Sequence, residues 1–139
     1  MTGLAALLIP VDGDPEVLVD SDWSATAVKA ALGGPVACSD PLFQSKRSLT
    51  LLLSSERGEV NPYAPALVPL EVRCGPLLVL AMAGHPLRPV GLTKPDLILL
   101  GVHLLLDETR AALLSKQSPR RVEPAGAQTP LPTKGEEPL

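Results

Sequence analysis

Short apolar runs that stop at proline, glycine or acidic residues recur along this chain, and they limit it to short strands and helices. Leu4–Ile9 is such a run and ends at Pro10, as a buried strand does. Residues 11–15 are dense in turn formers, and Glu16–Asp20 follows as a second strand. We expect these two strands to form a hairpin with a five-residue connection.

Similar patterns predict further strands and the loops between them. Residues 70–73 alternate between apolar and charged side chains, as a half-exposed strand does. Residues 61–66 hold two prolines close together, which predicts an ordered loop or a short helical turn. The expected strands are 36–38, 48–55, 70–73 and Leu77–Ala83. The expected loops are 40–47, 56–59, 61–66 and 84–89.

The clearest helix signal follows the only tryptophan. Ser24 is a natural N-cap for a helix over Ala25–Leu32, and Gly-Gly-Pro at 33–35 stops that helix. With Ser24 as N-cap, Trp23 and Val28 occupy the two positions of a hydrophobic staple. We therefore expect a structural role for the tryptophan.

Residues 93–114 allow two interpretations. Thr93 or Lys94 precedes a proline and an aspartate, as at the start of a helix with Pro95 in the first helical position. The run 97–106 is apolar on every side, which a buried strand would match equally well. We favour one helix. Such a helix cannot turn every apolar side chain to one small core, so the surplus is expected to form a dimer or partner surface.

Together these elements predict an α/β fold of the α+β type. Residues 1–114 are expected to form one small domain with a mixed or antiparallel sheet of four to six strands, the short helix near 24–32 and a C-terminal helix. Residues 115–139 contain five prolines and few large apolar groups, which is the composition of a disordered tail.

Composition restricts the partners that the chain can bind. The hydrophobic fraction is 45%, but Trp, Tyr and Phe occur once each, so few rings are available for base stacking or sugar binding. Residues 1–114 carry 8 Lys and Arg against 12 Asp and Glu, a balance of −4. A mildly acidic domain without a basic face binds phosphate backbones poorly, so we expect no nucleic-acid partner.

The apolar runs also bear on location. The N-terminal run has neither the basic flank nor the cleavage pattern of a signal peptide. The longest apolar run is about half of the ~20 residues that a membrane span needs. We therefore expect a cytoplasmic location without membrane association, and reduced thiols at Cys38 and Cys74.

Three short patterns follow one another along residues 4–106. They are Leu-Leu-Ile-Pro-Val-Asp-Gly at 7–13 with Pro-Glu-Val at 15–17, a helix that closes in Leu-Gly-Gly at 32–34, and a polar turn at 56–58 leading to Asn61, Ala64 and an apolar strand at 75–80. In these features the chain resembles a domain family of uncharacterised small proteins from phages and actinobacteria. It departs from that family at Pro35 and in its proline-rich tail. The resemblance implies a setting in phage or another mobile element and implies no activity.

Two sets of residues are candidates for metal binding. The first set is five acids within eleven residues: Asp12, Asp14, Glu16, Asp20 and Asp22. Their spacing does not match a calcium loop, and acids on turns and strand edges usually face solvent. The second set has the atoms for zinc: Cys38, Cys74, His85 and His103. Because structural zinc sites bring ligands in close pairs, which this set lacks, we expect no metal and no cofactor.

Catalytic motifs are not found in the sequence. It has neither a P-loop nor a nucleophile elbow, and its Gly-Gly pair follows a helix, whereas a dinucleotide fingerprint precedes one. We therefore expect no catalytic residues and no enzymatic activity. A weak hydrolase that uses Cys38 or His85 is the least favoured alternative.

Our leading hypothesis is a non-enzymatic accessory protein that binds another protein or a second copy of itself. An exposed tyrosine beside prolines suits recognition, and a histidine on a helical dimer surface would make a pH-sensitive contact. The residues expected to contribute to an interaction surface or a pocket are Asn61, Tyr63, His85, Arg88 and His103.

The alternative is a domain that binds a small molecule or a nucleotide. In that case the loops at 12–15, 61–64 and 85–88 would converge on one pocket. The expected anion contacts are Arg57, Arg73 and Arg88.

Overall fold

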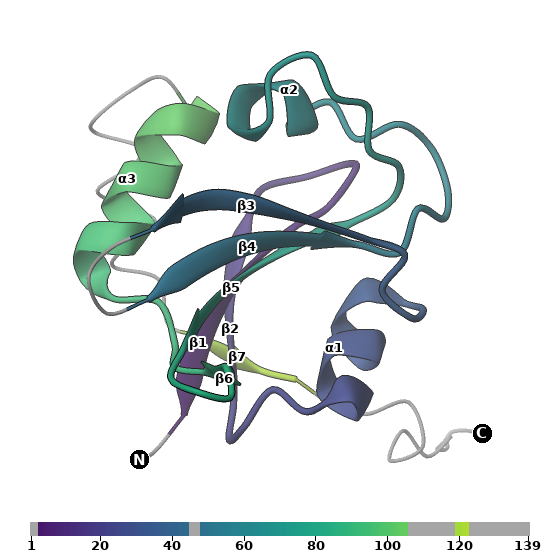
Figure 1. Ribbon diagram of the computed structural model, residues 1–139. Coiled ribbons are helices and arrows are strands. Elements are labelled where there is room, and N and C mark those ends of the chain that lie inside the picture. Colours follow the sequence, from purple (N-terminus) through teal and green to yellow (C-terminus); the bar gives the residue numbers. More distant parts are fainter. Residues whose placement is uncertain (1–2, 45–47, 106–118, 123–139) are drawn as a thin grey trace, which may run out of the picture.

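A mixed sheet of seven strands organises the protein, whose computed structural model describes residues 3–44, 48–105 and 119–122 (Figure 1). Three helices pack against this sheet, which confirms the predicted fold class. In chain order the elements are β1 (Leu4–Ile9), β2 (Glu16–Asp20), α1 (Ala25–Leu32), β3 (Cys38–Gln44), β4 (Leu49–Ser54), α2 (Ala64–Leu67), β5 (Leu77–Ala83), β6 (Arg88–Pro89), α3 (Lys94–Leu105) and β7 (Arg120–Arg121).

The sheet has the strand order β3-β4-β5-β1-β2-β7, and β6 pairs with β5 outside this path. Neighbouring strands are antiparallel, except that β7 runs parallel to β2. β1 and β2 form the predicted hairpin, with Leu8 opposite Glu16. Residues 10–15 connect them, one residue more than predicted.

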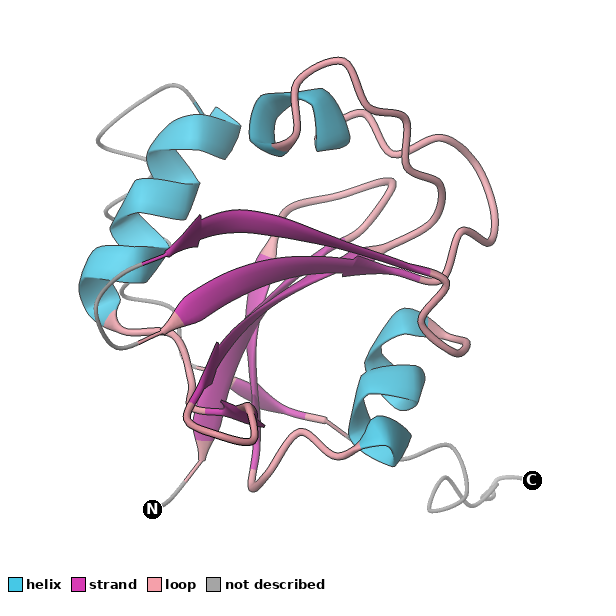
Figure 2. Ribbon diagram, in the orientation of Figure 1, coloured by secondary structure: helices cyan, strands magenta, loops and turns pink. Residues whose placement is uncertain are grey.

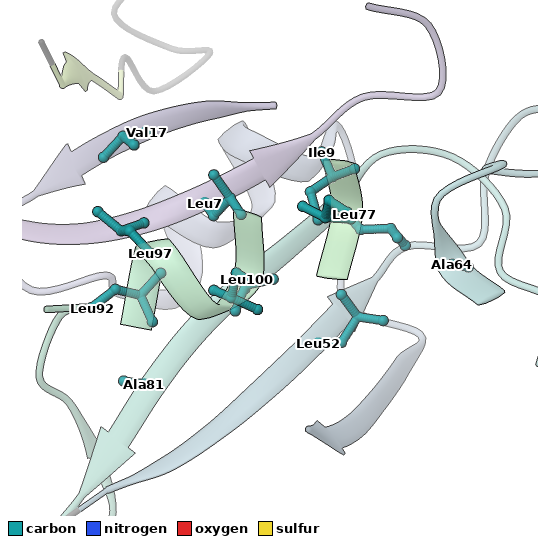
Figure 3. Close-up of a cluster of buried hydrophobic side chains, with 12 residues drawn as sticks. Leu7, Ile9, Val17, Leu52, Ala64, Leu77, Ala81, Leu92, Leu97 and Leu100 are labelled. Carbon is teal, nitrogen blue, oxygen red and sulfur yellow. The ribbon is translucent and has the colours of Figure 1, made fainter. Parts of the chain in front are cut away.

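Alternating side chains divide the core between the two faces of the sheet. Along β5, Leu77, Val79 and Ala81 pack in one cluster with α3, whereas Leu78 and Leu80 pack in the other with α1. The two-residue period of a strand produces this division. Figure 2 shows α2 and α3 on one side of the sheet and α1 on the other. Figure 3 shows the buried cluster on the α3 side.

Both ends of α1 are capped as predicted. The hydroxyl of Ser24 accepts a hydrogen bond from the Ala27 amide at 3.4 Å. Gly33 adopts φ = 79° and donates its amide to the Lys29 carbonyl at 2.8 Å, which closes the last turn. Local sequence therefore decides where this helix begins and ends.

Trp23 ties α1 to the centre of the sheet. Its side chain is 3% exposed and packs in the α1-side cluster with Val28, as the predicted staple requires. Its indole Nε1 donates to the Leu4 carbonyl at 2.7 Å, so the ring is also anchored to β1. This bond satisfies the one polar atom of a buried indole.

The helix interpretation of residues 93–114 is confirmed for α3. The Asp96 amide donates to Thr93 Oγ1 at 3.3 Å, and the Thr93 amide donates to Asp96 Oδ2 at 2.9 Å. This reciprocal pair makes Thr93 the N-cap, so Pro95 lies in the second helical position rather than the first. Residues 106–114 lie outside the described residues.

The predictions between α1 and β4 are wrong. In place of a strand at 36–38 and a loop at 40–44, the structure has β3, an edge strand paired with β4. Residues 45–47 of the predicted loop at 40–47 lie outside the described residues. Its register shifts between Pro41 and Phe43. An edge strand tolerates a proline and a bulge, so Pro41 and the register shift are compatible with a strand at the edge of the sheet.

The strand predicted at 70–73 is also wrong. Leu70 is 99% exposed and adopts φ = 67°, in the left-handed region that side chains rarely enter. The one pairing near this segment is an isolated bridge between Val60 and Cys74. Alternation alone could not reveal that no neighbouring strand within the described residues pairs with it.

The boundary between domain and tail differs from the prediction. Arg120–Arg121 forms β7, and Val122 is buried in the α1-side cluster. Arg120 Nη2 lies 2.7 Å from Glu16 Oε1, and this bond lowers the pKa of the Glu16 carboxyl. This segment belongs to the domain, and the rest of the predicted tail lies outside the described residues.

Candidate functional site

α1 covers only part of its side of the sheet. With eight residues it is about 12 Å long and, at about 10 Å across, it spans roughly two strands spaced about 4.8 Å apart. Its main contacts are with β5. The area over β4 and the end of β5 therefore stays open, and Leu51 and Met82 are only half-buried there.

An apolar groove of about 450 Å³ occupies this open area. Its floor consists of Leu51 and Leu53 from β4 and Leu80 and Met82 from β5, all on the face that carries α1. The other lining residues are Trp23, Ala25, Val28, Lys29, Pro35, Val36 and Pro89. Lys29 is the only charged residue among them. This size and an apolar lining with few polar groups are typical of small-molecule sites.

One end of the groove lies at Trp23 and Met82. The Trp23 indole reaches the Leu4 carbonyl at the start of β1, and the antiparallel pairing places the start of β1 beside the end of β5. Two carboxylates precede the tryptophan in the chain. Asp20 Oδ2 accepts a hydrogen bond from the Trp23 amide at 2.9 Å. Asp22, the residue directly before Trp23, is exposed. Arg88 also lies near this end, because it precedes the lining residue Pro89, which pairs with Met82. The two acids therefore outnumber this cation.

The opposite end lies at Pro35 and Val36. The following residue, Ala37, donates its amide to the carbonyl of Ser54, the last residue of β4. The Arg57 side chain lies beside Gly34, the residue before Pro35: a Cβ added to Gly34 would lie 3.1 Å from its Cδ and Nε. Lys29 stands on the helical wall, one turn before the Gly-Gly stop. Within the described residues, no ion pair joins Lys29 or Arg57 to an acid. This end of the groove is therefore cationic.

Asn61 and Tyr63 hold the fold together elsewhere. Asn61 is fully buried, and its Nδ2 donates to the carbonyls of Ile9 and Gly75, each at 3.0 Å. Its Oδ1 accepts the Tyr63 amide at 2.9 Å. The Tyr63 hydroxyl donates to the Gly13 carbonyl at 3.2 Å. These bonds bring together two of the three loops that were expected to converge.

His85 and Arg88 lie at the other end of β5, His85 in the exposed turn that leads to β6 and Arg88 as the first residue of β6. The length of β5 separates them from the loops that Tyr63 joins, so the three loops do not converge on one pocket (Figure 1). The expected arginine set is likewise dispersed. Arg73 Nε lies 2.8 Å from Asp40 Oδ2, and this carboxylate raises the pKa of the guanidinium.

A second polar cluster surrounds Glu56. The carboxylate accepts the Cys74 amide at 2.9 Å and the Ser54 hydroxyl at 2.7 Å, and these bonds lower the pKa of Glu56. The Ser54 side chain is 1% exposed, so this hydroxyl is not open to a substrate. The cluster closes the loop between β4 and β5.

α3 carries an exposed aliphatic face. Ile98, Leu99 and Val102 are 42%, 43% and 36% exposed, respectively. His103 is also exposed on this helix. The surplus apolar surface that the sequence predicted is therefore present on α3.

The described residues offer little for other kinds of site. They contain no group of three His, Cys, Asp or Glu side chains that could hold a metal ion. Cys38 and Cys74 are free thiols. No described helix has the length and apolar character to cross a membrane. The absence of a metal, a cofactor and catalysis stays a prediction.

Sequence reasoning did not find the groove. Trp23 was assigned to helix packing alone, and no role was expected for Lys29 or Met82. The available signal was β4, where Leu51 and Leu53 face one side and Leu52 faces the other. Leucines on both faces of a strand predict that other elements cover both faces of the sheet. Here α1 covers its face of the sheet only in part.

Comparison of the chain with known protein families, curated proteins and solved structures finds no match. The resemblance to the phage and actinobacterial domain family therefore stays a prediction.

Proposed function

We propose that this protein is a non-enzymatic binding domain and that the groove beside α1 holds an apolar ligand. One observation carries the proposal: a groove of about 450 Å³ has an aliphatic lining with a single charged residue, Lys29. Burying apolar ligand surface there supplies about 25 cal/mol per Å². The lining contains no His, Cys, Asp, Glu or Ser, so the groove has the groups for binding rather than for acid–base or nucleophilic chemistry.

This proposal keeps one class of function expected from the sequence, small-molecule binding, and places it at a different site. The sequence suggested loops with arginine contacts, which favours an anion such as a nucleotide. The groove instead favours an apolar body, because its floor consists of Leu51, Leu53, Leu80 and Met82. A cytoplasmic location and a setting in mobile elements stay predictions from the sequence.

Binding of the neutral dye N-phenylnaphthylamine tests the proposal. Trp23 is the only tryptophan and lines the groove, so a dye bound there should accept excitation energy from it. We expect saturable dye fluorescence on excitation of Trp23, together with a higher melting temperature when the dye is present. A chain that neither binds the dye nor gains stability from it would contradict the proposal.

A matched pair of variants locates the bound dye. Ala25 is exposed and lines the groove, whereas its neighbour Thr26 is exposed outside it. Ala25→Phe should fill the groove and weaken dye binding, and Thr26→Phe should leave binding unchanged. Equal binding by both variants would show that the dye binds elsewhere.

We also propose a second candidate function, the binding of a protein partner or a second copy of the chain through α3. The observation that favours it is the exposed aliphatic face of Ile98, Leu99 and Val102. Contiguous exposed apolar side chains of this kind are typical of protein interfaces.

A further inference from the structure

We infer that the groove binds a free single-chain anionic amphiphile of the fatty-acid type, with its tail at Trp23 and its head group at Lys29 and Arg57. The inference rests on the proposed function of the groove and adds the class and the direction of the ligand. Three features of the site support it: the shape of the groove, the chemistry of its lining and the distribution of charge between its ends.

The shape favours a linear ligand. α1 forms one wall, and the floor is a strip of two neighbouring strands, β4 and β5, so the groove runs lengthwise between its two ends. Its extent along α1 is limited to about 12 Å by the eight residues of that helix. A single extended alkyl chain fits such a strip, whereas a second chain alongside it would need a wider floor.

The lining favours an aliphatic ligand over an aromatic one. Leu51, Leu53, Leu80 and Met82 form the floor, and Trp23 is the only aromatic residue that lines the groove. Aliphatic side chains give dispersion contacts along the whole length of an alkyl chain. They do not provide the pairs of rings between which a flat ligand stacks.

The charges fix the direction. Asp20 and Asp22 lie at the Trp23 end, together with one cation, Arg88, which precedes the lining residue Pro89. The two acids outnumber this cation, so that end would repel an anionic head group. Lys29 and Arg57 lie toward the Pro35 end, and neither is paired with an acid within the described residues. A carboxylate at that end would gain two cationic neighbours, and Arg offers a bidentate contact to it.

Bromine-labelled dodecanoate tests the direction directly. Bromine quenches tryptophan emission only at contact distance, and the chain has one tryptophan. Below the micelle concentration and at equal occupancy, dodecanoate brominated at its terminal carbon should quench Trp23 more strongly than dodecanoate brominated next to the carboxylate. Equal quenching, or the reverse order, would overturn the assigned direction.

Variants of the two cationic residues test whether the groove recognises the negative charge of the head group. We expect Lys29→Gln with Arg57→Gln to weaken dodecanoate binding by about fivefold, the scale of exposed ion pairs, and to leave the neutral dye unaffected. Lys94→Gln on α3 is the matched control, since Lys94 is exposed and lies outside the groove. Dodecyltrimethylammonium should bind more weakly than dodecanoate, and equal binding would overturn the inference.

The measurements separate this inference from the proposed function. If the neutral dye binds and dodecanoate shows no preference over the cationic amphiphile, the inference fails and the proposed function stands. If neither dye nor amphiphile binds, both fail. A dimer that dodecanoate dissociates would assign the groove to a second copy. If vesicles of brominated phosphatidylglycerol quench Trp23 as strongly as brominated dodecanoate does, the groove would be assigned to a membrane surface. Either result overturns the assignment to a free amphiphile.

Discussion

Individual polar residues hold the loops of this domain in place. Asn61 is fully buried and bonds to three different backbone groups, so it holds the segments that carry them together. Glu56 adopts φ = 58°, a conformation that costs a non-glycine residue free energy. Its bonds to the Cys74 amide and the Ser54 hydroxyl offset that cost.

The Glu56 cluster predicts a specific dependence of stability on pH. Glu56→Gln should lower the free energy of unfolding at neutral pH by about 1 kcal/mol, because a charge-assisted bond becomes a neutral one. The pKa of Glu56 is lower in the folded chain than its ordinary value of 4.5, so the folded state favours the ionised form. Its contribution is therefore complete above that ordinary value and is lost as the pH falls through the folded-state pKa. Urea unfolding over this range measures the difference.

Glu59→Gln is the matched control for this experiment. Glu59 is exposed on the same turn, and its substitution should leave both the stability and its acid dependence unchanged. If Glu56→Gln followed the wild-type curve at every pH, the carboxylate would have no role in closing the loop.

The two longer helices differ in how they use their apolar residues. α3 directs three leucines into the core and leaves aliphatic side chains on its outer face; the core residues are Leu97, Leu100 and Leu104. α1 turns a narrow face to the sheet and leaves the neighbouring floor of leucines open. One helix therefore offers a convex apolar face and the other borders a concave one.

The exposed face of α3 predicts an interface that can be removed without unfolding the domain. Ile98→Ser with Val102→Ser should weaken a complex through this face by about tenfold or more, because two apolar side chains lose burial. Native mass spectrometry of protein purified from its host measures the complex, and circular dichroism checks the fold. Leu87→Ser is the control, because Leu87 is 51% exposed in the turn between β5 and β6. If the double variant keeps the same mass and partners, α3 is not an interface.

The sheet as a whole is completed by a segment far along the chain. β7 pairs with β2 at one edge, and Val122 closes the α1-side cluster at 7% exposure. Arg120 contributes an exposed ion pair to Glu16, which adds little to stability. The edge of the sheet therefore depends on residues beyond the predicted end of the domain.

Truncation measures the contribution of this edge. A chain that ends at residue 118 should unfold about 2 kcal/mol more easily than a chain that ends at residue 122, because it loses the burial of Val122 and the pairing of β7. Urea unfolding of the two truncated chains gives the difference. Equal unfolding midpoints would mean that β7 does not stabilise the domain.

Local chemistry within the sequence determined the elements at the start and the centre of the sheet. β1, β2, α1 and β5 have the predicted bounds, since each is an apolar run or a capped helix between strong turn formers. Where the local signals conflicted, prediction failed. Residues 40–44 were expected in a loop but belong to an edge strand, and alternation at 70–73 suggested a strand where no described strand pairs with it.

Only the tertiary structure decided the candidate site. The groove exists because one eight-residue helix is narrower than the sheet that it covers, and no local pattern encodes that difference in width. Trp23 and Lys29 from the α1 segment line it together with side chains of β4 and β5, and Arg57 lies near its Pro35 end. Asn61 and His85, which the sequence grouped together, lie at opposite ends of β5 because antiparallel pairing separates the loops that carry them. Local sequence sets the length of α1, but strand pairing and the placement of that helix on the sheet determine which side chains share a surface.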